Sequence, residues 1–284
     1  MQSAPQLKCG KEVSNLKPSL DAIWARGEAD LKQVEKAGEM LMSWLTQVPG
    51  VGPPTMIQDV GKSQHAELIF DEETTAKIIE KCHEQSISVT TAVHTAFALA
   101  NHAVEQRVDE PKTAKYVSLT QFNLRKYLGE TWDQSESAAN VYYTPMPIIT
   151  PVGHFKDMNR HIQNFYKGTF EDPQSMAQVT SQLTKAIFQL AQSPEFLAAP
   201  VPGDAMLSSL GVAERYLRRR YGGIEVVDLH QGVDVVMGLA MMSVYTFGDR
   251  LRLTNCYNEA AQDGRMIKRI LHGTGEFLRQ GLGL

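Results

Sequence analysis

Cysteine is scarce in this sequence, and no apolar run is long enough to form a membrane span. The cysteines are Cys9, Cys82 and Cys256, and no CxxC spacing links them. Three thiols without paired spacing indicate neither a disulfide framework nor a zinc site, so we expect free thiols in a reducing compartment. The longest apolar run, Val233 to Phe247, contains Asp234 and is shorter than a membrane-spanning helix requires.

The sequence has no excess of positive charge, and its first residues do not have the pattern expected of a leader segment. The 284 residues carry 28 Lys and Arg against 32 Asp and Glu, a formal net charge of -4, with no long basic block. We therefore predict no nucleic-acid partner. The N-terminal residues lack the apolar core of a signal peptide. With 43% hydrophobic and 21% charged residues, we predict a soluble cytoplasmic protein that binds no membrane.

Helical and strand-like patterns alternate along the chain. Helical spacing of apolar residues predicts helices at about 24–45, 71–85, 88–106 and 262–280, and two within 154–195 that Asp172 and Pro173 separate. Ser19 or Asp21, and Ser88 or Thr90, could cap the first and third of these. Runs of β-branched and aromatic residues predict strands at 65–71, 116–123, 139–149, 205–209, 224–229, 237–247 and 251–256. This order favours one α/β domain with a mixed β-sheet covered by helices.

Several segments carry a family resemblance in a consistent order. They are KEVSNLKPSL (11–20), SISVTTAVHTAFALA (86–100), QFNLRKYL (121–128), VYYTPMPI (141–148), SSLG (208–211), RYLRRRYGG (215–223) and YTFGDRLRLTNCYNE (245–259). Together they resemble the C-terminal lobe of the CoA-dependent acyltransferase and condensation-like superfamily, of the type found in fungal secondary metabolism. The resemblance implies a single lobe of the chloramphenicol-acetyltransferase-like fold, with a linker-like lead-in at 1–20 and the lobe at 21–284. We expect Met1 to follow the catalytic lobe of a longer relative.

The family's catalytic His-x-x-x-Asp motif belongs to its N-terminal half, which has no counterpart in this sequence. In the family the motif His is the general base that takes a proton from the acceptor. HQGVD (230–234) is the only string here with that spacing, and it lies inside the C-terminal block. Asp228 stands two residues before His230, so strand alternation places both on one face. We name His230, Asp228 and Asp234 as candidate catalytic residues, with an ordinary strand-end histidine as the alternative.

Hydroxyl and aromatic side chains supply the other candidates. The resemblance places Ser208 and Ser209 where related transferases have small hydroxyl residues facing the reaction centre, so we add both as catalytic candidates. A strand-end turn that ends at Gly211 is the alternative. Candidate substrate-binding residues are Asn123, Tyr142, Tyr143 and Tyr245, although core tyrosines would give the same pattern.

Two further features have a structural and a functional interpretation. His94 lies in the buried helix, where a core histidine that donates to a backbone carbonyl is favoured over a catalytic base. The four arginines of 215–220 could bind the phosphates of a CoA-like ligand, or form a solvated helix end. No His, Cys, Asp and Glu cluster has metal-ligand spacing, so we predict no metal and no cofactor.

Three functions remain open at this stage. The first, which we favour here, is a biosynthetic enzyme that binds a lipophilic intermediate and promotes cyclisation, cycloaddition or rearrangement without CoA. The second is a CoA-dependent O- or N-acyltransferase completed by an N-terminal lobe or a partner chain. The third is a non-catalytic remnant or partner subunit. An exposed lobe interface would also favour a homo-oligomer or a partner lobe.

Overall fold

A four-stranded mixed sheet is the main sheet of the structure. The computed structural model describes residues 17–24, 28–45, 61–104, 115–129, 142–194, 206–235 and 240–284. The strand order is β1 (Ser63–Ile69), β8 (Arg250–Asn258), β7 (Met241–Phe247) and β4 (Met206–Val212). β4 runs parallel to β7, and the other neighbours are antiparallel. The prediction of a mixed sheet is therefore confirmed.

A two-residue turn joins β7 to β8. Gly248 and Asp249 both have a φ of +59°, the left-handed conformation that a type I′ turn requires at both central positions. The turn sets Phe247 opposite Arg250 and Tyr245 opposite Arg252. The Gly248 N–H donates to the Glu214 carboxylate at 2.6 Å, which ties this turn to the 3-10 turn Ala213–Arg215. The register of the two central strands follows from this turn.

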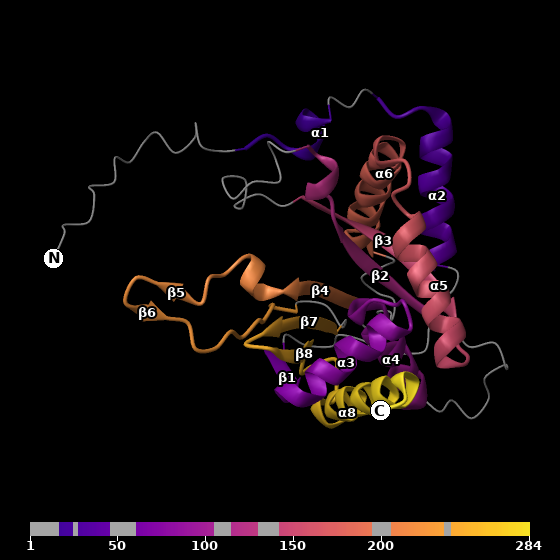
Figure 1. Ribbon diagram of the computed structural model, residues 1–284. Helices are drawn as coiled ribbons and strands as arrows, with labels where there is room; N and C mark the ends of the chain where they lie inside the picture. The colour runs from indigo at the N-terminus through magenta and orange to yellow at the C-terminus, as the bar shows by residue number, and fades with distance from the viewer. Residues whose placement is uncertain are drawn as a thin grey trace.

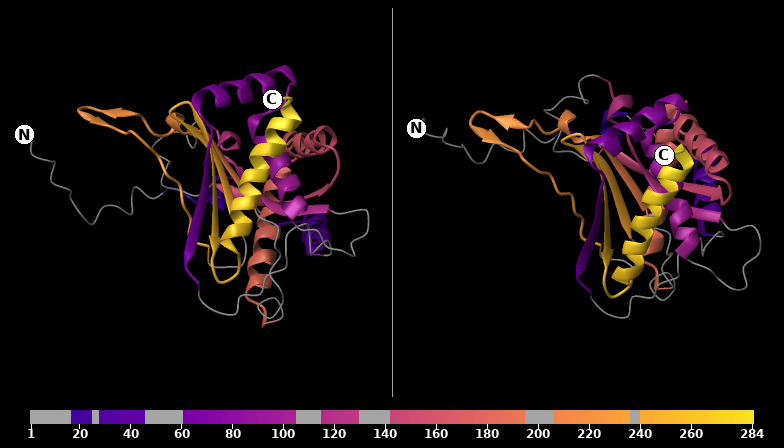
Figure 2. Two further views of the ribbon diagram at one scale, coloured as in Figure 1. Left: turned by 90° about the horizontal axis from the view of Figure 1, so that it is seen from below. Right: turned by 60° about the horizontal axis from the view of Figure 1, so that its bottom comes forward.

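Helices cover one face of this sheet, which we call the inner face (Figures 1 and 2). They are α4 (Val89–Val104), α8 (Gly264–Leu282) and α3 (Glu72–Glu84). α4 is apolar nearly all round, and most of its side chains are buried, as expected of a helix packed on several sides. The main core lies between α4, α8 and the sheet and includes Phe97, Leu207, Met242, Leu253 and Leu278.

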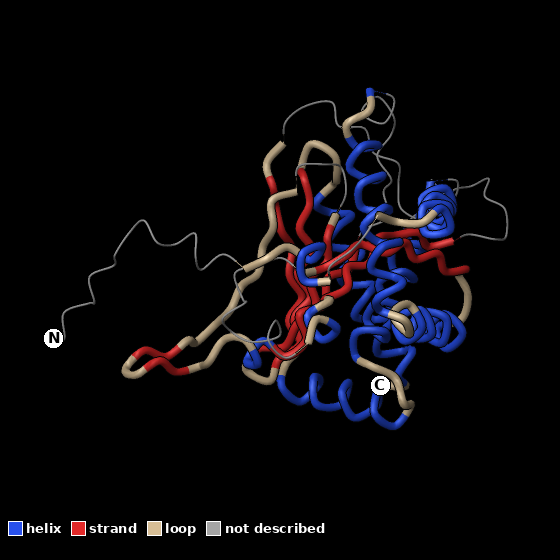
Figure 3. The backbone as a smooth tube through the Cα atoms, turned by 90° about the horizontal axis from the view of Figure 1, so that it is seen from above, coloured by secondary structure: helices blue, strands red, loops and turns tan. Residues whose placement is uncertain are grey.

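A second layer packs on the far side of α4, as the labels of Figure 1 show, and Figure 3 gives the view from above. It contains the hairpin of β2 (Lys115–Asn123) and β3 (Tyr143–Pro151), the 3-10 turn Arg125–Tyr127, and the helices α2 (Leu31–Leu45), α5 (Phe155–Gly168) and α6 (Pro173–Ala191). Its core is aromatic: Phe122 packs against the rings of Phe165, Tyr166 and Phe170. The Asp172 carboxylate accepts from the Ser175 N–H at 3.1 Å, so the predicted break between α5 and α6 is confirmed.

The first predicted helix is interrupted, which corrects the range 24–45. Ser19 caps a short helix, α1 (Leu20–Ile23), and α2 begins only at Leu31. The physical reason is a capping box at the second start, because the Asp30 carboxylate accepts from the Gln33 N–H at 2.8 Å and the Gln33 side chain accepts from the Asp30 N–H at 3.0 Å. Ser88 caps α4 through the Thr91 N–H at 3.0 Å.

A β-arm projects from the end of β4, away from the rest of the structure (Figure 1). It consists of the 3-10 turn Ala213–Arg215, the strand pair β5 (Arg220–Tyr221) and β6 (Ile224–Glu225), and a return segment of residues 226–235. The predicted strand 224–229 is thus wrong beyond Glu225. Beyond it, the Val226 N–H donates to the Arg219 carbonyl at 2.8 Å, whereas Asp228 and Leu229 contact side chains of β7 and β8.

The fold class predicted from the sequence is confirmed, whereas other expectations fall on residues that the structure does not describe. These include Cys9 and most of the lead-in 1–20, so the domain division stays a prediction. Cys82 and Cys256 are free and buried, and burial raises the pKa of the Cys82 thiol to about 11. In the described ranges, no helix is long and apolar enough to cross a membrane.

Candidate functional site

The face of the sheet opposite α4 and α8, which we call the outer face, carries a row of polar residues. Register places Ser208, Ser243, Thr254 and Glu67 side by side across all four strands. The preceding row, with Leu207, Met242 and Ala66, belongs to the core, so alternation turns the polar row to the other face. The Thr254 hydroxyl donates to Glu67 Oε1 at 3.3 Å, in agreement with this placement.

Four charged side chains form a chain of contacts on the outer face, which we call the outer-face cluster. Arg252 Nη2 lies 2.5 Å from Asp228 Oδ1, and Asp228 Oδ2 lies 3.2 Å from His230 Nε2. His230 Nδ1 faces Glu67 Oε2 at 3.6 Å. The Arg252 side chain is only 5% exposed, whereas that of His230 is 65% exposed. The cluster therefore runs from a buried cation to a histidine at the surface.

Hydrogen bonds to the same strands hold the return segment in place. The Leu229 carbonyl accepts from the Tyr245 hydroxyl at 3.1 Å and from Arg252 Nη1 at 3.3 Å. Farther along, the Val235 N–H donates to Ser63 Oγ at 2.9 Å and the Val235 carbonyl accepts from Asn258 Nδ2 at 3.1 Å. The segment thus contacts the outer face at Leu229 and again at Val235, its last residue.

The electrostatics of Asp228 favour its ionised form. Partial desolvation acts to raise the pKa of this carboxyl, but the Leu229 N–H and the charges of Arg252 and His230 together lower it below its usual value of 3.8. An ionised Asp228 can then hold both Arg252 and the His230 ring. The candidates Asp228 and His230 are thus brought together, as strand alternation indicated.

Each ring nitrogen of His230 faces a carboxylate, although the ring itself is largely exposed. A general base needs one nitrogen directed at the acceptor proton, so His230 would have to leave Asp228 or Glu67 to act in this way. Asp234 is exposed, and the structure gives it no hydrogen bond or ion pair with another described residue. The structure therefore does not join His230 and Asp234, and catalysis by either stays a prediction.

Ser208 and Ser209 point to opposite faces of β4. Ser208 belongs to the outer polar row, whereas Ser209 Oγ lies 2.8 Å from Thr90 Oγ1 of α4. A register shift between Ser209 and Gly211, with Gly211 at a φ of +69°, follows directly after the pair. The two hydroxyls therefore cannot meet one substrate carbonyl in this conformation, and Ser208 is the one on the side of the outer-face cluster.

The predicted substrate-binding residues do not form one group. Tyr245 is buried and donates to the Leu229 carbonyl beneath the return segment. The Tyr142 hydroxyl donates to the Pro18 carbonyl at 3.0 Å, and Asn123 Oδ1 accepts from the Arg125 N–H at 3.0 Å. Tyr143 is 47% exposed on β3. Only Tyr245 lies at the outer-face cluster, and substrate binding by all four stays a prediction.

His94 is a core histidine, although its partners differ from the expected backbone carbonyl. Its Nε2 lies 3.2 Å from the Tyr116 hydroxyl and its Nδ1 lies 3.2 Å from the Tyr166 hydroxyl. Burial lowers the pKa of His94 to about 3, which keeps the ring neutral near pH 7. With both nitrogens bonded inside the core, His94 has no access to a substrate.

The arginine cluster lies on the β-arm and not at the end of an α-helix, which corrects the structural alternative. Arg219 stacks on the Phe247 ring at 5.7 Å, and Arg220 lies 3.7 Å from Glu225. All four arginines are exposed: Arg215, Arg218, Arg219 and Arg220. Within the described ranges, no group of three or more His, Cys, Asp or Glu side chains could hold a metal ion.

Glu67 and Arg252 were missed from the sequence, although a signal for both exists. In RLRLTN (250–255), Leu251 and Leu253 belong to the core. Because side chains alternate along a strand, Arg252 between them faces away from the core. A mid-strand arginine that is nearly buried requires a carboxylate partner. Alternation in β1 assigns Glu67 to the same face.

Comparison with proteins of known sequence points to fungal biosynthetic proteins. No protein-family model matches the chain. It is 27% identical over 273 residues to "O-acetyltransferase pigM" of Monascus ruber, which covers 92% of this chain and 52% of the relative. It is also 27% identical over 222 residues to "Azaphilone biosynthesis cluster protein M" of Aspergillus terreus, covering 77% of this chain and 53% of the relative. The chain thus spans about half the length of these curated relatives.

Solved structures show the same fold. The trichothecene 15-O-acetyltransferase TRI3 of Fusarium sporotrichioides matches with a TM-score of 0.76 at 15% identity, covering 97% of this chain and 58% of that protein. The structure of a condensation domain that mediates chain release from the enacyloxin polyketide synthase matches with a TM-score of 0.54 at 11% identity, covering 89% of this chain and 48% of that chain. In sequence relatives and in fold, the chain matches the CoA-dependent acyltransferase and condensation-like superfamily.

Proposed function

We propose that this chain is the C-terminal lobe of a CoA-dependent acyltransferase that acylates a lipophilic intermediate in fungal secondary metabolism. One observation carries the proposal: nearly the whole chain matches one half of a named O-acetyltransferase by sequence and one half of another by fold. This support is stronger than that for the CoA-independent cyclase favoured by the sequence alone, because no relative reported above is named as a cyclase.

The reaction requires a base and groups that stabilise negative charge on the thioester oxygen. An acceptor oxygen bonds to the acyl carbon, the C–S bond breaks, and CoA leaves as its thiol after taking up the acceptor's proton. In the superfamily the base comes from the N-terminal lobe. The outer face of this lobe would supply donors, for which Ser208 is the best placed, because Arg252 is nearly buried and bonded to Asp228 and Leu229. Arg252 Nε is buried and has no hydrogen-bond partner in the structure.

The β-arm supports a two-lobe enzyme. Tyr216, Ile224 and Val227 are 72%, 70% and 80% exposed, which is unusual for three large apolar side chains on one projecting segment. We propose that the catalytic lobe covers them, whether that lobe belongs to the same polypeptide or to another chain. A second copy of this chain is the alternative that light scattering would detect.

The test is acyl transfer by the complete polypeptide that the transcript encodes. We would determine the transcript, search it for an in-frame His-x-x-x-Asp, express the product and follow thiol release from acetyl-CoA with extracts of the producing fungus as acceptors. The proposal predicts acceptor-dependent thiol release by the complete polypeptide and only background release by residues 1–284 alone. Conversion of an acceptor without thiol release would contradict it and favour the cyclase.

The same assay tests the five catalytic candidates. If His230 supplies only a structural contact, His230→Gln should retain thiol release within about tenfold of the unsubstituted enzyme, whereas loss of a general base costs about 100-fold or more. Ser208→Ala should lower the rate more than Ser209→Ala, because only Ser208 lies in the outer polar row. Asp228→Asn and Asp234→Asn complete the series.

A further inference from the structure

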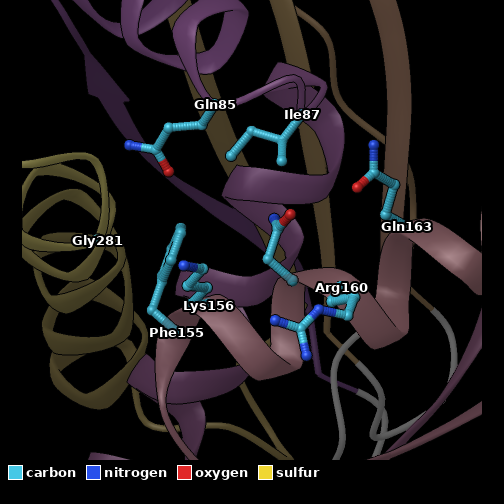
Figure 4. Close-up of a pocket in the computed structure, with 8 residues that line it drawn as sticks. Gln85, Ile87, Phe155, Lys156, Arg160, Gln163 and Gly281 are labelled. Carbon is cyan, nitrogen blue, oxygen red and sulfur yellow. The ribbon is translucent and has the colours of Figure 1, made fainter.

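A pocket on the opposite side of α4 from the sheet has no role in the proposed reaction. It lies where the end of α3, the start of α5 and the end of α8 meet, and its volume is about 390 Å³. Figure 4 shows Gln85 and Ile87 facing it from one side and Phe155, Lys156 and Arg160 from α5. The lining residues are Gln85, Ile87, Phe155, Lys156, Asn159, Arg160, Gln163 and Gly281.

A buried acceptor without a partner lies in the wall of this pocket. Asn159 is only 2% exposed, and its Oδ1 has no hydrogen-bond partner in the structure. The orientation of its amide is fixed by Thr95, whose hydroxyl donates to the Thr91 carbonyl at 2.8 Å and so accepts from Asn159 Nδ2 at 3.2 Å. Asn159 therefore offers an unused acceptor that an N–H or O–H donor can satisfy.

The charge of the lining is positive. Lys156 and Arg160 are its only ionisable residues, and none of the eight is acidic. Lys156 makes no ion pair with another described residue, and Arg160 has only a 3.5 Å contact to Asp157 with both side chains more than 60% exposed. Lys156 also lies in the first turn of the 14-residue helix α5, where the helix dipole adds positive potential.

Helix geometry places these groups together. Lys156, Asn159, Arg160 and Gln163 occupy positions i, i+3, i+4 and i+7 of α5, which form one face of the helix. The Gln163 amide is tied to the Ser86 carbonyl at 2.9 Å and the Gln85 amide to the Leu282 carbonyl at 3.3 Å, so both walls are held. A Cβ at Gly281 would collide with the Phe155 ring, so a glycine is required for this close approach.

We propose that this pocket binds a small hydroxycarboxylic acid. The carboxylate would contact Lys156 and Arg160, and the hydroxyl would donate to Asn159 Oδ1. Ile87 and Phe155 add an apolar surface for the carbon skeleton. The inference does not rest on the proposed acyl transfer, because it concerns binding alone and a different face of the lobe.

The test compares two acids that differ by one hydroxyl. Calorimetric titration of residues 1–284 with malate and with succinate, without any acyl donor, should give an affinity for malate about fivefold higher, the usual effect of one hydrogen bond. Asn159→Leu should remove this preference. Lys156→Gln should weaken both acids about tenfold. The matched control Lys167→Gln, at the exposed C-terminal end of α5, should leave both affinities within about twofold.

Three results would overturn the proposal. They are the absence of saturable binding by the folded chain, equal affinity for malate and succinate, and equal losses in Lys156→Gln and Lys167→Gln. If sulfate binds as tightly as malate, the pocket holds an adventitious ion only, which also overturns it. Lys156 lies on the surface, so its variant keeps the test valid if Asn159→Leu fails to fold.

Discussion

The inner and outer faces of the four-stranded sheet differ in chemistry over the same two central strands. On the inner face Met242, Leu251 and Leu253 are buried against α4 and α8. On the outer face Arg252, Thr254 and Tyr245 bond to the return segment and to Glu67. Because strand residues alternate between faces, the difference depends on every second residue. The comparison indicates that the inner face supplies the main core and that the outer face holds the return segment.

The largest expected effect comes from the inner face. Leu253 is fully buried in the main core, so Leu253→Ala should lower the free energy of unfolding by about 2–5 kcal/mol through lost burial and a cavity. Denaturant unfolding measures the change. A loss below about 1 kcal/mol would show that the inner face is not the main source of stability.

The second prediction concerns His94, which lies in the core behind the inner face and should make the free energy of unfolding depend on pH. Burial lowers the pKa of His94 to about 3, from 6.5. In the unfolded chain His94 is therefore protonated below about pH 6.5, whereas in the folded chain it is protonated only below about pH 3. The contribution of neutral His94 to the free energy of unfolding is fully present above pH 6.5. It is lost as the pH falls toward 3, by about 2 kcal/mol between pH 7 and pH 5.

The measurement is denaturant unfolding at several pH values. His94→Gln should flatten this part of the profile, whereas the control His83→Gln, at an exposed position on α3, should not. Equal profiles for the two variants would mean that another group causes the loss.

A smaller effect is expected on the outer face. Asp228→Asn removes the charge that pairs with Arg252 and His230, and should cost about 1 kcal/mol because the carboxylate is 43% exposed. It should also speed amide hydrogen exchange at 226–235. Since the folded pKa of Asp228 lies below its usual 3.8, this contribution is present above pH 3.8 and is lost as the pH falls through the lower folded value. Unchanged exchange would indicate that the cluster does not hold the return segment.

The smallest effect is expected on the β-arm. Val227 is 80% exposed, so Val227→Ser should change the free energy of unfolding by less than about 0.5 kcal/mol. In the complete polypeptide, where we propose that another lobe covers it, the same substitution should cost more. Equal small effects in both contexts would remove the arm from the lobe interface.

The fold could be predicted well because its elements have strong local signals. The apolar α4, the Asp172 and Pro173 break and the alternating β8 each follow from short-range sequence patterns. The first helix was predicted too long, because the capping box of Asp30 and Gln33 restarts a helix within a continuous apolar pattern.

The candidate site could be predicted only in part. Asp228 and His230 meet because they are two residues apart, which sequence spacing reveals. Their other partners, Arg252 and Glu67, come from strands at distant positions in the chain, and a local pattern cannot show that these strands are neighbours. Ser208 and Ser209 were treated as a pair, yet alternation in β4 separates adjacent residues.

The proposed function is tested most directly by following the acyl group itself. The complete polypeptide would be incubated with isotope-labelled acetyl-CoA and extracts of the organism that encodes it, and products would be analysed by mass spectrometry. A C-terminal lobe of an acyltransferase predicts a product that carries the labelled acetyl group in an ester or amide. A converted product without the label would contradict acyl transfer and support rearrangement in the absence of CoA.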